Sequence, residues 1–188
     1  MKRLLHAEIQ QTRLSEAEAA SAENRFPLIA ILDNIRSMYN VGSIFRTSDG
    51  ARIEALYTVG YTPHPPRKEI EKTALDATRT IPHKHFKTMS EAIAEAKSRG
   101  FHIAALELTN NTKSIYDLTE HDFPIALLIG NEITGVSDDA LTECEFSVAI
   151  PMLGAKHSLN VSVAYGVALY ECLRVFNTKL DSFRPIQS

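Results

Sequence analysis

Residues 125–135 read Ile-Ala-Leu-Leu-Ile-Gly-Asn-Glu-Ile-Thr-Gly. The first five residues are apolar and rich in branched side chains, and Pro124 precedes them, so they predict a short buried β-strand. At Gly130 the apolar run gives way to a polar loop that contains a second glycine. Four further apolar runs, at residues 28–32, 55–60, 101–106 and 147–150, predict four more strands.

The segments between these strands predict helices. An amphipathic pattern covers residues 89–99 and ends at Gly100, a residue typical of the position just beyond a helix. Residues 43–50 and 159–176 also favour helix, whereas residues 62–72 are too rich in proline for a regular element. Strands that alternate with helices predict an α/β domain with a mostly parallel sheet.

The domain is expected at residues 27–178. Residues 2–24 lack glycine and proline and favour helix, which predicts a peripheral helical extension over residues 1–26. Residues 179–188 are expected to form a C-terminal tail.

Composition narrows the class of protein. The chain has 188 residues, with 20 Lys and Arg against 23 Asp and Glu, and a net charge of −3. This balance argues against adhesion to nucleic acid over the whole surface but allows a local basic face. The two cysteines, Cys144 and Cys172, are too few for a disulfide scaffold, so we expect reduced, buried thiols. No apolar run is long enough to span a membrane and the start lacks a signal-peptide pattern, which predicts a cytoplasmic protein.

Ligands of open parallel sheets bind beyond the carboxyl ends of the strands, so the chemistry is expected in the loops there. The first such loop, residues 34–47, contains Asn40, Gly42 and Arg46. Its spacing favours a functional site and a plain helix cap with a surface arginine about equally. The second loop, residues 127–137, lacks both the Gly-Lys-Ser/Thr and the Gly-x-Gly-x-x-Gly signature of phosphate and dinucleotide sites. Its alternative interpretation is a glycine turn in which Ser137 caps the next helix.

The third loop, residues 150–164, alternates polar and apolar residues. Ser158, Asn160 and Ser162 are polar positions in an otherwise apolar stretch, and buried polar groups need hydrogen-bond partners. This pattern favours a site. The alternative is a helix cap at Ser158, with the other polar groups bonded locally.

Together these loops resemble the SpoU (TrmH-type) RNA ribose 2′-O-methyltransferases of the SPOUT superfamily. The family motifs are Asn-x-Gly-x-x-x-Arg, here residues 40–46, Gly-x-Glu-x-x-Gly, here residues 130–135, and Ile-Pro-Met followed by Ser-Leu-Asn-Val-Ser, here residues 150–162. The resemblance covers residues 28–175. One departure is Asp76, which stands where the family stretch Lys-Thr-Ala-Leu-Gly-Ala has its glycine. The basic C-terminal extension of some tRNA-specific members is reduced to Lys179 and Arg184.

The resemblance implies a fold, a cofactor and an assembly. The fold would be a SPOUT-type sheet with a deep C-terminal trefoil knot, and the cofactor would be S-adenosylmethionine. The protein would be a homodimer with an active site shared between subunits. The positions that match the cofactor wall are Leu106, Glu107, Leu108, Gly130, Asn131, Ile150, Met152 and Leu159.

The resemblance also implies catalytic roles. In the family, the arginine that matches Arg46 is thought to activate the ribose hydroxyl; the alternative is that it binds the neighbouring phosphate. Asn40 would orient Arg46 or the ribose, and Glu132, Ser158 and Asn160 would complete the site. The implied substrate is structured RNA, tRNA rather than rRNA. The alternatives are an rRNA methyltransferase and a non-catalytic RNA-binding module.

Basic residues for an RNA backbone are also present. We expect phosphate contacts from Arg36, Arg67, Lys72 and Arg79, with the alternative of a solvated charged surface. The wider basic set adds His64, Lys68, His83, Lys84, His85, Lys87 and Arg52. A metal site at the histidines is not expected, because the usual carboxylate or cysteine ligands are missing beside them.

Overall fold

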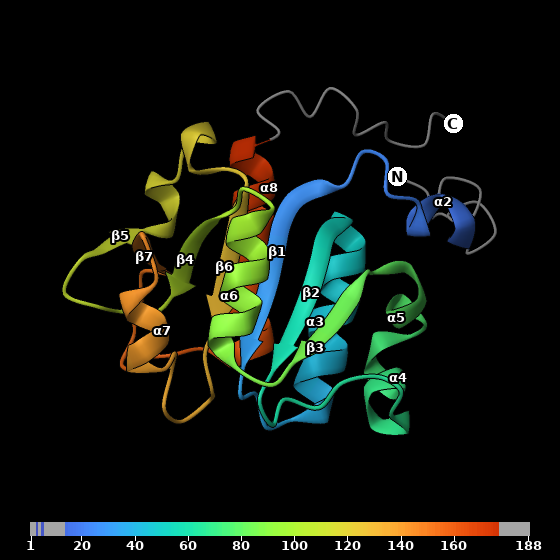
Figure 1. Cartoon of the computed structure of the whole chain (residues 1–188), viewed down its shortest axis with the longest axis horizontal. Coiled ribbons are helices and arrows are strands. Elements are labelled where there is room, and N and C mark those ends of the chain that lie inside the picture. The colour runs from blue at the N-terminus through green and yellow to red at the C-terminus, as the bar shows by residue number, and fades with distance from the viewer. Residues whose placement is uncertain (1–2, 4, 6–13, 177–188) are drawn as a thin grey trace.

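The computed structural model describes residues 3, 5 and 14–176, and within them it shows one seven-stranded sheet (Figure 1). The strands lie in the order β3-β2-β1-β6-β4-β7-β5, and every neighbouring pair is parallel. This confirms the predicted α/β domain with a mostly parallel sheet; the C-terminal knot stays a prediction. The strand bounds are Phe26–Asp33 (β1), Ile53–Val59 (β2), His83–Phe86 (β3), His102–Leu106 (β4), Thr112–Ser114 (β5), Ile125–Ile129 (β6) and Phe146–Ala149 (β7).

Helices cover both faces of the sheet. In Figure 1, α6 lies in front of it, and α3 and α8 lie behind. The helices are α2 (Glu16–Ala20), α3 (Met38–Ala51), α4 (Lys68–Ala74), α5 (Ala77–Thr80), α6 (Met89–Ser98), α7 (Asp138–Thr142) and α8 (Val161–Phe176), with 3-10 turns η1 (Ile115–Asp117) and η2 (Glu120–Asp122).

The central strand β1 contributes residues to two hydrophobic cores, one on each face of the sheet. Its even-numbered residues, such as Leu28 and Leu32, are fully buried on the face of α3 and α8. Ile29 and Ile31 are fully buried on the opposite face, which α6 covers. Burial on both faces explains why the strand is a continuous apolar run and shows no alternation of polar residues.

The five predicted strands are present, but two strands were not predicted from the sequence. β3 lies at one edge of the sheet, and its His83, Lys84 and His85 are exposed. β5 lies at the other edge and contains three half-buried residues with no large apolar side chain. Edge strands such as these carry polar residues, so the apolar runs used for prediction are missing.

Two helix starts differ from the expectation. The stretch 62–72 was expected to be a loop throughout, but α4 begins at Lys68, after the last proline. The helix expected from residue 43 begins earlier, at Met38, so Asn40 lies inside α3 and the alternative in which it caps this helix does not hold. Ser37 caps it with its side chain, which accepts a hydrogen bond from Asn40 N (3.3 Å). The predicted end of α6 is confirmed, since Gly100 has a φ of +80°.

The cysteines are not paired. Cys172 is buried on α8, and burial raises the pKa of its thiol to about 12. Cys144 is half-buried, which corrects the expectation of a buried thiol, and burial still raises its pKa to about 11. Both thiols are therefore protonated and unreactive at neutral pH.

The ends of the chain lie partly outside the described residues. Of the helix predicted over residues 2–24, only α2 is described, and Lys179 and Arg184 also lie outside. Arg25 anchors the start of the domain by donating to the carbonyl oxygens of Ala19 (2.9 Å), Ile53 (3.1 Å) and Thr80 (2.9 Å).

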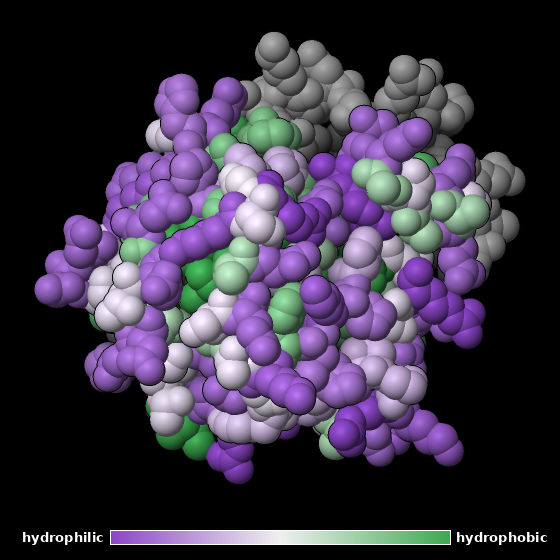
Figure 2. Space-filling view, in the orientation of Figure 1, coloured by the Kyte–Doolittle hydropathy of each residue, from purple (hydrophilic) through white to green (hydrophobic). Residues whose placement is uncertain are grey.

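The side of the molecule seen in Figure 2 is mostly hydrophilic, with hydrophobic residues in small patches. Among the described residues, every helix is too short or too polar to cross a membrane.

Candidate active site

A cavity of about 940 Å³ lies at the carboxyl ends of β4, β6 and β7. Its volume is in the range of small-molecule sites. Every position that the sequence assigned to cofactor binding lines it: Leu106, Glu107, Leu108, Gly130, Asn131, Ile150, Met152 and Leu159. These positions come from three separate strand ends, which the sheet brings to one edge.

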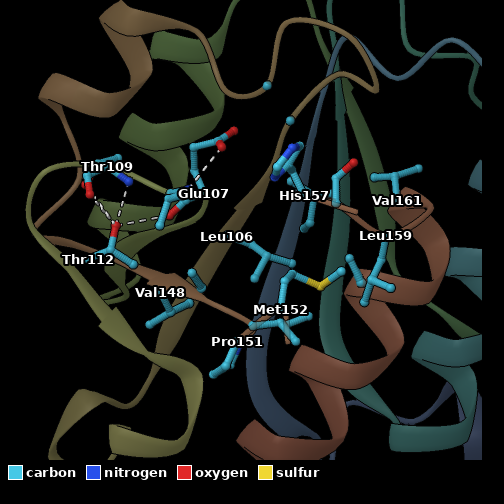
Figure 3. A pocket seen from close by; sticks show the side chains of 18 of the residues that line it. Leu106, Glu107, Thr109, Thr112, Val148, Pro151, Met152, His157, Leu159 and Val161 are labelled. Atoms are coloured by element: carbon cyan, nitrogen blue, oxygen red, sulfur yellow. Dashed lines mark hydrogen bonds between the residues drawn. The ribbon is translucent and has the colours of Figure 1, made fainter. Parts of the chain in front are cut away.

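The cavity has an apolar wall and a polar wall. Figure 3 shows the side chains of Leu106, Met152 and Leu159 gathered on one side. On the other side, Thr109 and Thr112 are hydrogen-bonded through Thr109 N and Thr112 Oγ1 (2.6 Å). Such a cavity suits a ligand with both apolar and polar parts.

The loop after β6 folds tightly over the end of β4. A Cβ atom at Gly130 would collide with the backbone of Gly135 and Val136, so no larger residue fits there. Gly135 has a φ of +70°, and a side chain on it would strike the Glu107 carboxylate. That carboxylate accepts a hydrogen bond from Val136 N (3.1 Å). Steric constraints therefore explain why both positions of the second motif are occupied by glycine.

Asn131 holds this loop to the loops after β1 and β2. Its side-chain nitrogen donates to Asn34 O (2.6 Å) and to the Tyr61 hydroxyl (2.7 Å), and its oxygen accepts from Ile133 N (2.8 Å) and Thr134 N (3.1 Å). The residue is 7% exposed. All the hydrogen-bonding groups of its side chain are thus satisfied by the protein, and its backbone N–H and carbonyl are bonded to Gly135 (3.0 Å each), so Asn131 shapes the loop rather than offering a free group to a ligand.

Glu132 points to the start of α3. Its carboxylate accepts from Arg36 N (3.1 Å), Ser37 N (3.4 Å) and Asn40 Nδ2 (3.0 Å). Partial burial raises the pKa of the carboxyl, but the hydrogen bonds outweigh it and hold the pKa below its usual value. The carboxylate is therefore charged and lies where a helix N-terminus favours a negative charge.

Asn40 links this carboxylate to the third motif. Its side-chain oxygen accepts a hydrogen bond from Asn160 Nδ2 (3.3 Å). The Asn160 oxygen in turn accepts from Ser162 N (3.0 Å), so Asn160, and not Ser158, caps α8. One residue from each of the three motifs, Asn40, Glu132 and Asn160, therefore joins a single hydrogen-bonded chain.

Two predicted catalytic residues lie apart from this chain. Ser158 is exposed and lines the cavity. Arg46 is exposed on α3 outside the cavity lining, about a third of a turn around the helix from Asn40. Among the described residues, neither side chain has a hydrogen-bond partner or an ion pair. The structure of one chain does not bring Arg46 to the cavity.

The residues predicted to bind RNA are all exposed: Arg36, Arg67, Lys72 and Arg79. Arg67 and Lys72 belong to α4 and its cap, and α4 is tied to the first turn of α3 by the Thr73 hydroxyl, which donates to Tyr39 O (3.0 Å). This places α4 beside the helix start that carries Asn40. Arg52, from the wider basic set, lies at the opposite end of α3 and donates to Glu18 O (2.7 Å).

The histidines in and near β3 pack against other rings of the protein. His64 and His85 lie ring to ring at 4.3 Å, and His83 packs edge-on against Phe45. In the described part of the chain, no three His, Cys, Asp or Glu residues are grouped as a metal site would require.

Sequence reasoning missed two residues that shape the site. Asp33, buried at the end of β1, accepts hydrogen bonds from Ser137 N (3.0 Å) and Asn34 Nδ2 (2.9 Å). Ser137 marks the start of α7 as expected, but its side chain makes no capping bond. Tyr61 is the second missed residue. The signal for both was their place directly after an apolar strand.

A sequence model of the SpoU rRNA Methylase family matches residues 27–170. Over 150 residues the chain is 33% identical to a Staphylococcus epidermidis protein assigned to the TrmH family of tRNA/rRNA methyltransferases. The match covers 80% of this chain and 59% of that protein. The chain thus spans less than two thirds of the length of such curated relatives.

Two solved structures are also similar. The A. aeolicus TrmH/SpoU tRNA modifying enzyme is 30% identical with a TM-score of 0.76, and the match covers 90% of this chain and 86% of that one. The AdoMet-bound rRNA methyltransferase of Sinorhizobium meliloti is 26% identical with a TM-score of 0.74, covering 83% and 59%.

Proposed function

The chain belongs to the SpoU methylase family, and from that premise we propose that it methylates a ribose 2′-hydroxyl of RNA with S-adenosylmethionine. The observation that carries the proposal is the hydrogen-bonded chain of Asn40, Glu132 and Asn160 at the edge of the cavity. A protein that only bound RNA would have no use for such a chain beside a cavity of cofactor size.

The residues of the cavity fit this cofactor. Leu106, Met152 and Leu159 offer an apolar wall to an adenine and a thioether chain, and the backbone at Gly130 and Ile150 offers hydrogen bonds. When bound, S-adenosylmethionine supplies an electrophilic methyl group on a sulfonium. In the reaction the ribose oxygen would bond to that methyl carbon as the sulfur–carbon bond breaks, leaving S-adenosylhomocysteine, and the hydroxyl proton would pass to solvent water.

Arg46 is assigned to the ribose and its phosphate. A guanidinium stays protonated in proteins, so Arg46 binds the phosphate beside the target ribose and draws the hydroxyl into place. Asn40 and Glu132 fix the start of α3, and Ser158 and Asn160 line the cavity where the ribose enters. Positioning of the two reactants is the main contribution of these residues to rate.

The active unit is a homodimer. An exposed stripe on α3 and an exposed apolar stripe on α8 form one surface: Tyr39, Arg46 and Gly50 on α3 and Val163, Val167 and Tyr170 on α8. The hydroxyl of Tyr170 lies beside Gly50, which joins the two stripes. A second copy of the chain docked on this surface would bring its Arg46 to the cavity, which a single chain does not do.

The substrate is structured RNA, with tRNA favoured and the cytoplasm as the place of action. Of the two solved structures described above, the tRNA modifying enzyme matches over the larger share of both chains, which supports tRNA. The rRNA methyltransferase structure keeps rRNA as the second candidate. No metal is assigned a role.

The test compares cofactor binding with methyl transfer. Calorimetry should show binding of S-adenosylmethionine by the wild type and by Arg46→Ala alike, because Arg46 lies outside the cavity lining. Transfer of labelled methyl to bulk tRNA or rRNA should be lost in Arg46→Ala and partly kept in Arg46→Lys. Near-normal transfer by Arg46→Ala would refute the assignment, and a wild type that neither binds the cofactor nor methylates RNA would refute the function.

Mixed subunits test the shared site. Arg46→Ala and Asn160→Ala proteins, each inactive alone, should regain activity when they are co-expressed and form mixed dimers. Failure to regain activity in purified mixed dimers would show that each chain supplies its own Arg46.

A further inference from the structure

Tyr61 is an exposed aromatic residue that the protein holds rigidly. Its side chain is 62% exposed, although its hydroxyl accepts a hydrogen bond from Asn131 Nδ2 (2.7 Å). Its backbone N–H donates to Asn34 Oδ1 (3.1 Å). The next residue, Thr62, is buried and donates its hydroxyl to Leu32 O (3.0 Å). The ring is therefore fixed at its backbone and at its tip, while most of its surface faces outward.

The Tyr61 ring lies close to the hydrogen-bonded chain of Asn40, Glu132 and Asn160. Asn131, which binds the Tyr61 hydroxyl, directly precedes Glu132, and both residues line the cavity. The exposed Arg36 donates its backbone N–H to Glu132 (3.1 Å), so a cation for a phosphate lies at the same edge. The aromatic ring, the cation and the cavity are thus grouped at the carboxyl end of the sheet.

Other exposed tyrosines lack this combination. Tyr39 and Tyr170 belong to the surface assigned to the second copy of the chain. Tyr116 is 58% exposed on η1, and its backbone N–H donates to Ser114 Oγ (3.3 Å), but its ring has no hydrogen bond to any other described residue. Only at Tyr61, within the described residues, does the protein use hydrogen bonds to orient an exposed tyrosine ring beside the cavity.

We propose that Tyr61 is a stacking platform for an unpaired base of the RNA, next to the nucleotide that is methylated. An aromatic face stacks on any base, whereas a base inside a duplex is already stacked on its neighbours. The substrate class that fits is therefore RNA with splayed bases, such as a loop or a single-stranded end. This inference rests on the proposed function, because it takes RNA as the substrate.

Tryptophan fluorescence gives a direct test, since the chain contains no tryptophan. Tyr61→Trp places one reporter at the platform, and Tyr116→Trp is the matched control. A short oligoadenylate should quench the first reporter and leave the second unchanged. The same strand paired with oligouridylate should quench neither. Equal quenching of both reporters, or none at Tyr61→Trp, would overturn the proposal.

Affinity gives a second test that keeps the native ring. Tyr61→Phe removes the hydroxyl but keeps the aromatic face, so it should bind oligoadenylate nearly as well as the wild type. Tyr61→Ala should bind about 10- to 100-fold more weakly, the usual loss for one stacked base. Both variants lose the contact of the Tyr61 hydroxyl with Asn131, so any change in affinity for S-adenosylmethionine should be the same in both, and the difference between their affinities for oligoadenylate measures the aromatic face alone.

The two proposals fail in different ways. If the wild type methylates RNA but Tyr61→Ala binds oligoadenylate normally, the platform is refuted and the function stands. If the wild type binds neither the cofactor nor RNA, the proposed function fails and the platform fails with it.

Discussion

Replacing Asn40 with aspartate should destabilise the protein in a pH-dependent way. In the wild type, Asn40 Nδ2 donates to the Glu132 carboxylate at 3.0 Å, and the Asn40 oxygen accepts from Asn160 (3.3 Å). Asn40→Asp keeps the shape of the side chain but replaces the donor with a second carboxylate. The hydrogen bond to Glu132 then becomes a contact between like charges.

The magnitude follows from the distance and the surroundings. Two like charges 3 Å apart repel by about 1.4 kcal/mol in bulk water and by about 5.5 kcal/mol at an effective dielectric constant of 20. Glu132 is exposed and Asn40 is half-buried, so the repulsion lies toward the lower value. The lost hydrogen bond to a charged group adds about 1.5–3 kcal/mol. Rotation of the new carboxylate toward Asn160 relieves part of this, so the free energy of unfolding should fall by about 2–4 kcal/mol at neutral pH.

The pH dependence has a definite sign. The new carboxyl should have a raised pKa in the folded state, because ionising it places it against Glu132. Its stability deficit is therefore small below the ordinary aspartate pKa of about 3.9, and it grows as the pH rises through the raised value. The wild type behaves in the opposite way here. The lowered pKa of Glu132 stabilises the protein above the ordinary glutamate pKa, and this contribution is lost as the pH falls through the lowered value.

Urea unfolding followed by circular dichroism, at neutral and at mildly acidic pH, measures the difference between variant and wild type. Asn110→Asp is the matched control, because Asn110 is exposed and its side chain has no hydrogen bond among the described residues. Adding Glu132→Gln to Asn40→Asp should recover part of the loss, since the amide can donate to the new carboxylate. A variant as stable as the wild type at neutral pH, or a deficit that acid does not reduce, would refute the reasoning.

Two further predictions concern backbone positions. Gly42→Ala should lower stability by about 1–3 kcal/mol, because a Cβ atom there would collide with Ile70 O and the Thr73 hydroxyl of α4. Gly154→Ala, where a Cβ atom meets nothing within 4 Å, should leave the thermal midpoint unchanged; equal midpoints for both variants would argue against the tight packing of α3 on α4. Asp76 has a φ of +67°, so Asp76→Val should destabilise by about 1–2 kcal/mol in urea unfolding. Asp76→Gly should stay within about 0.5 kcal/mol of the wild type, because relief of strain is offset by greater freedom of the unfolded chain, and equal losses in both would contradict the strain.

The sequence predicted the sheet and the cavity well because both depend on local signals. A buried parallel strand is a continuous apolar run, and the loop at its end carries the glycines that a tight backbone crossing needs. At Gly130 both signals are adjacent in the chain, and the structure puts that residue in the cavity wall. At Asp76, an aspartate fills a left-handed position for which glycine is the usual residue, so the fold tolerates this departure from the family stretch.

The hydrogen-bonded chain and the position of Arg46 could not be predicted, because they depend on contacts between residues that are distant in the sequence. Asn40 and Asn160 are separated by 120 positions, and no periodicity relates them. The sequence left open whether Asn40 caps a helix, and the structure gives that role to Ser37, three residues earlier, whose side chain is equally suited to it. The sequence also placed the start of α3 at residue 43, later than Met38, where the structure has it, and gave no signal that Arg46 lies outside the cavity lining.

The adjacent residues Asn131 and Glu132 join the two sides of the site. Asn131 fixes the loops after β1 and β2, while Glu132 holds the start of α3, so the cavity wall and the start of α3 are held together in one frame. Substitutions within this frame should therefore change cofactor binding and RNA binding together, and their effects should not add. Tyr61 is bonded to this frame through its hydroxyl but exposes its ring, and Arg46 is exposed on α3 outside the cavity lining. Under the proposed function, we expect Arg46→Ala to separate methyl transfer from cofactor binding, and the comparison of Tyr61→Ala with Tyr61→Phe to separate RNA binding from it.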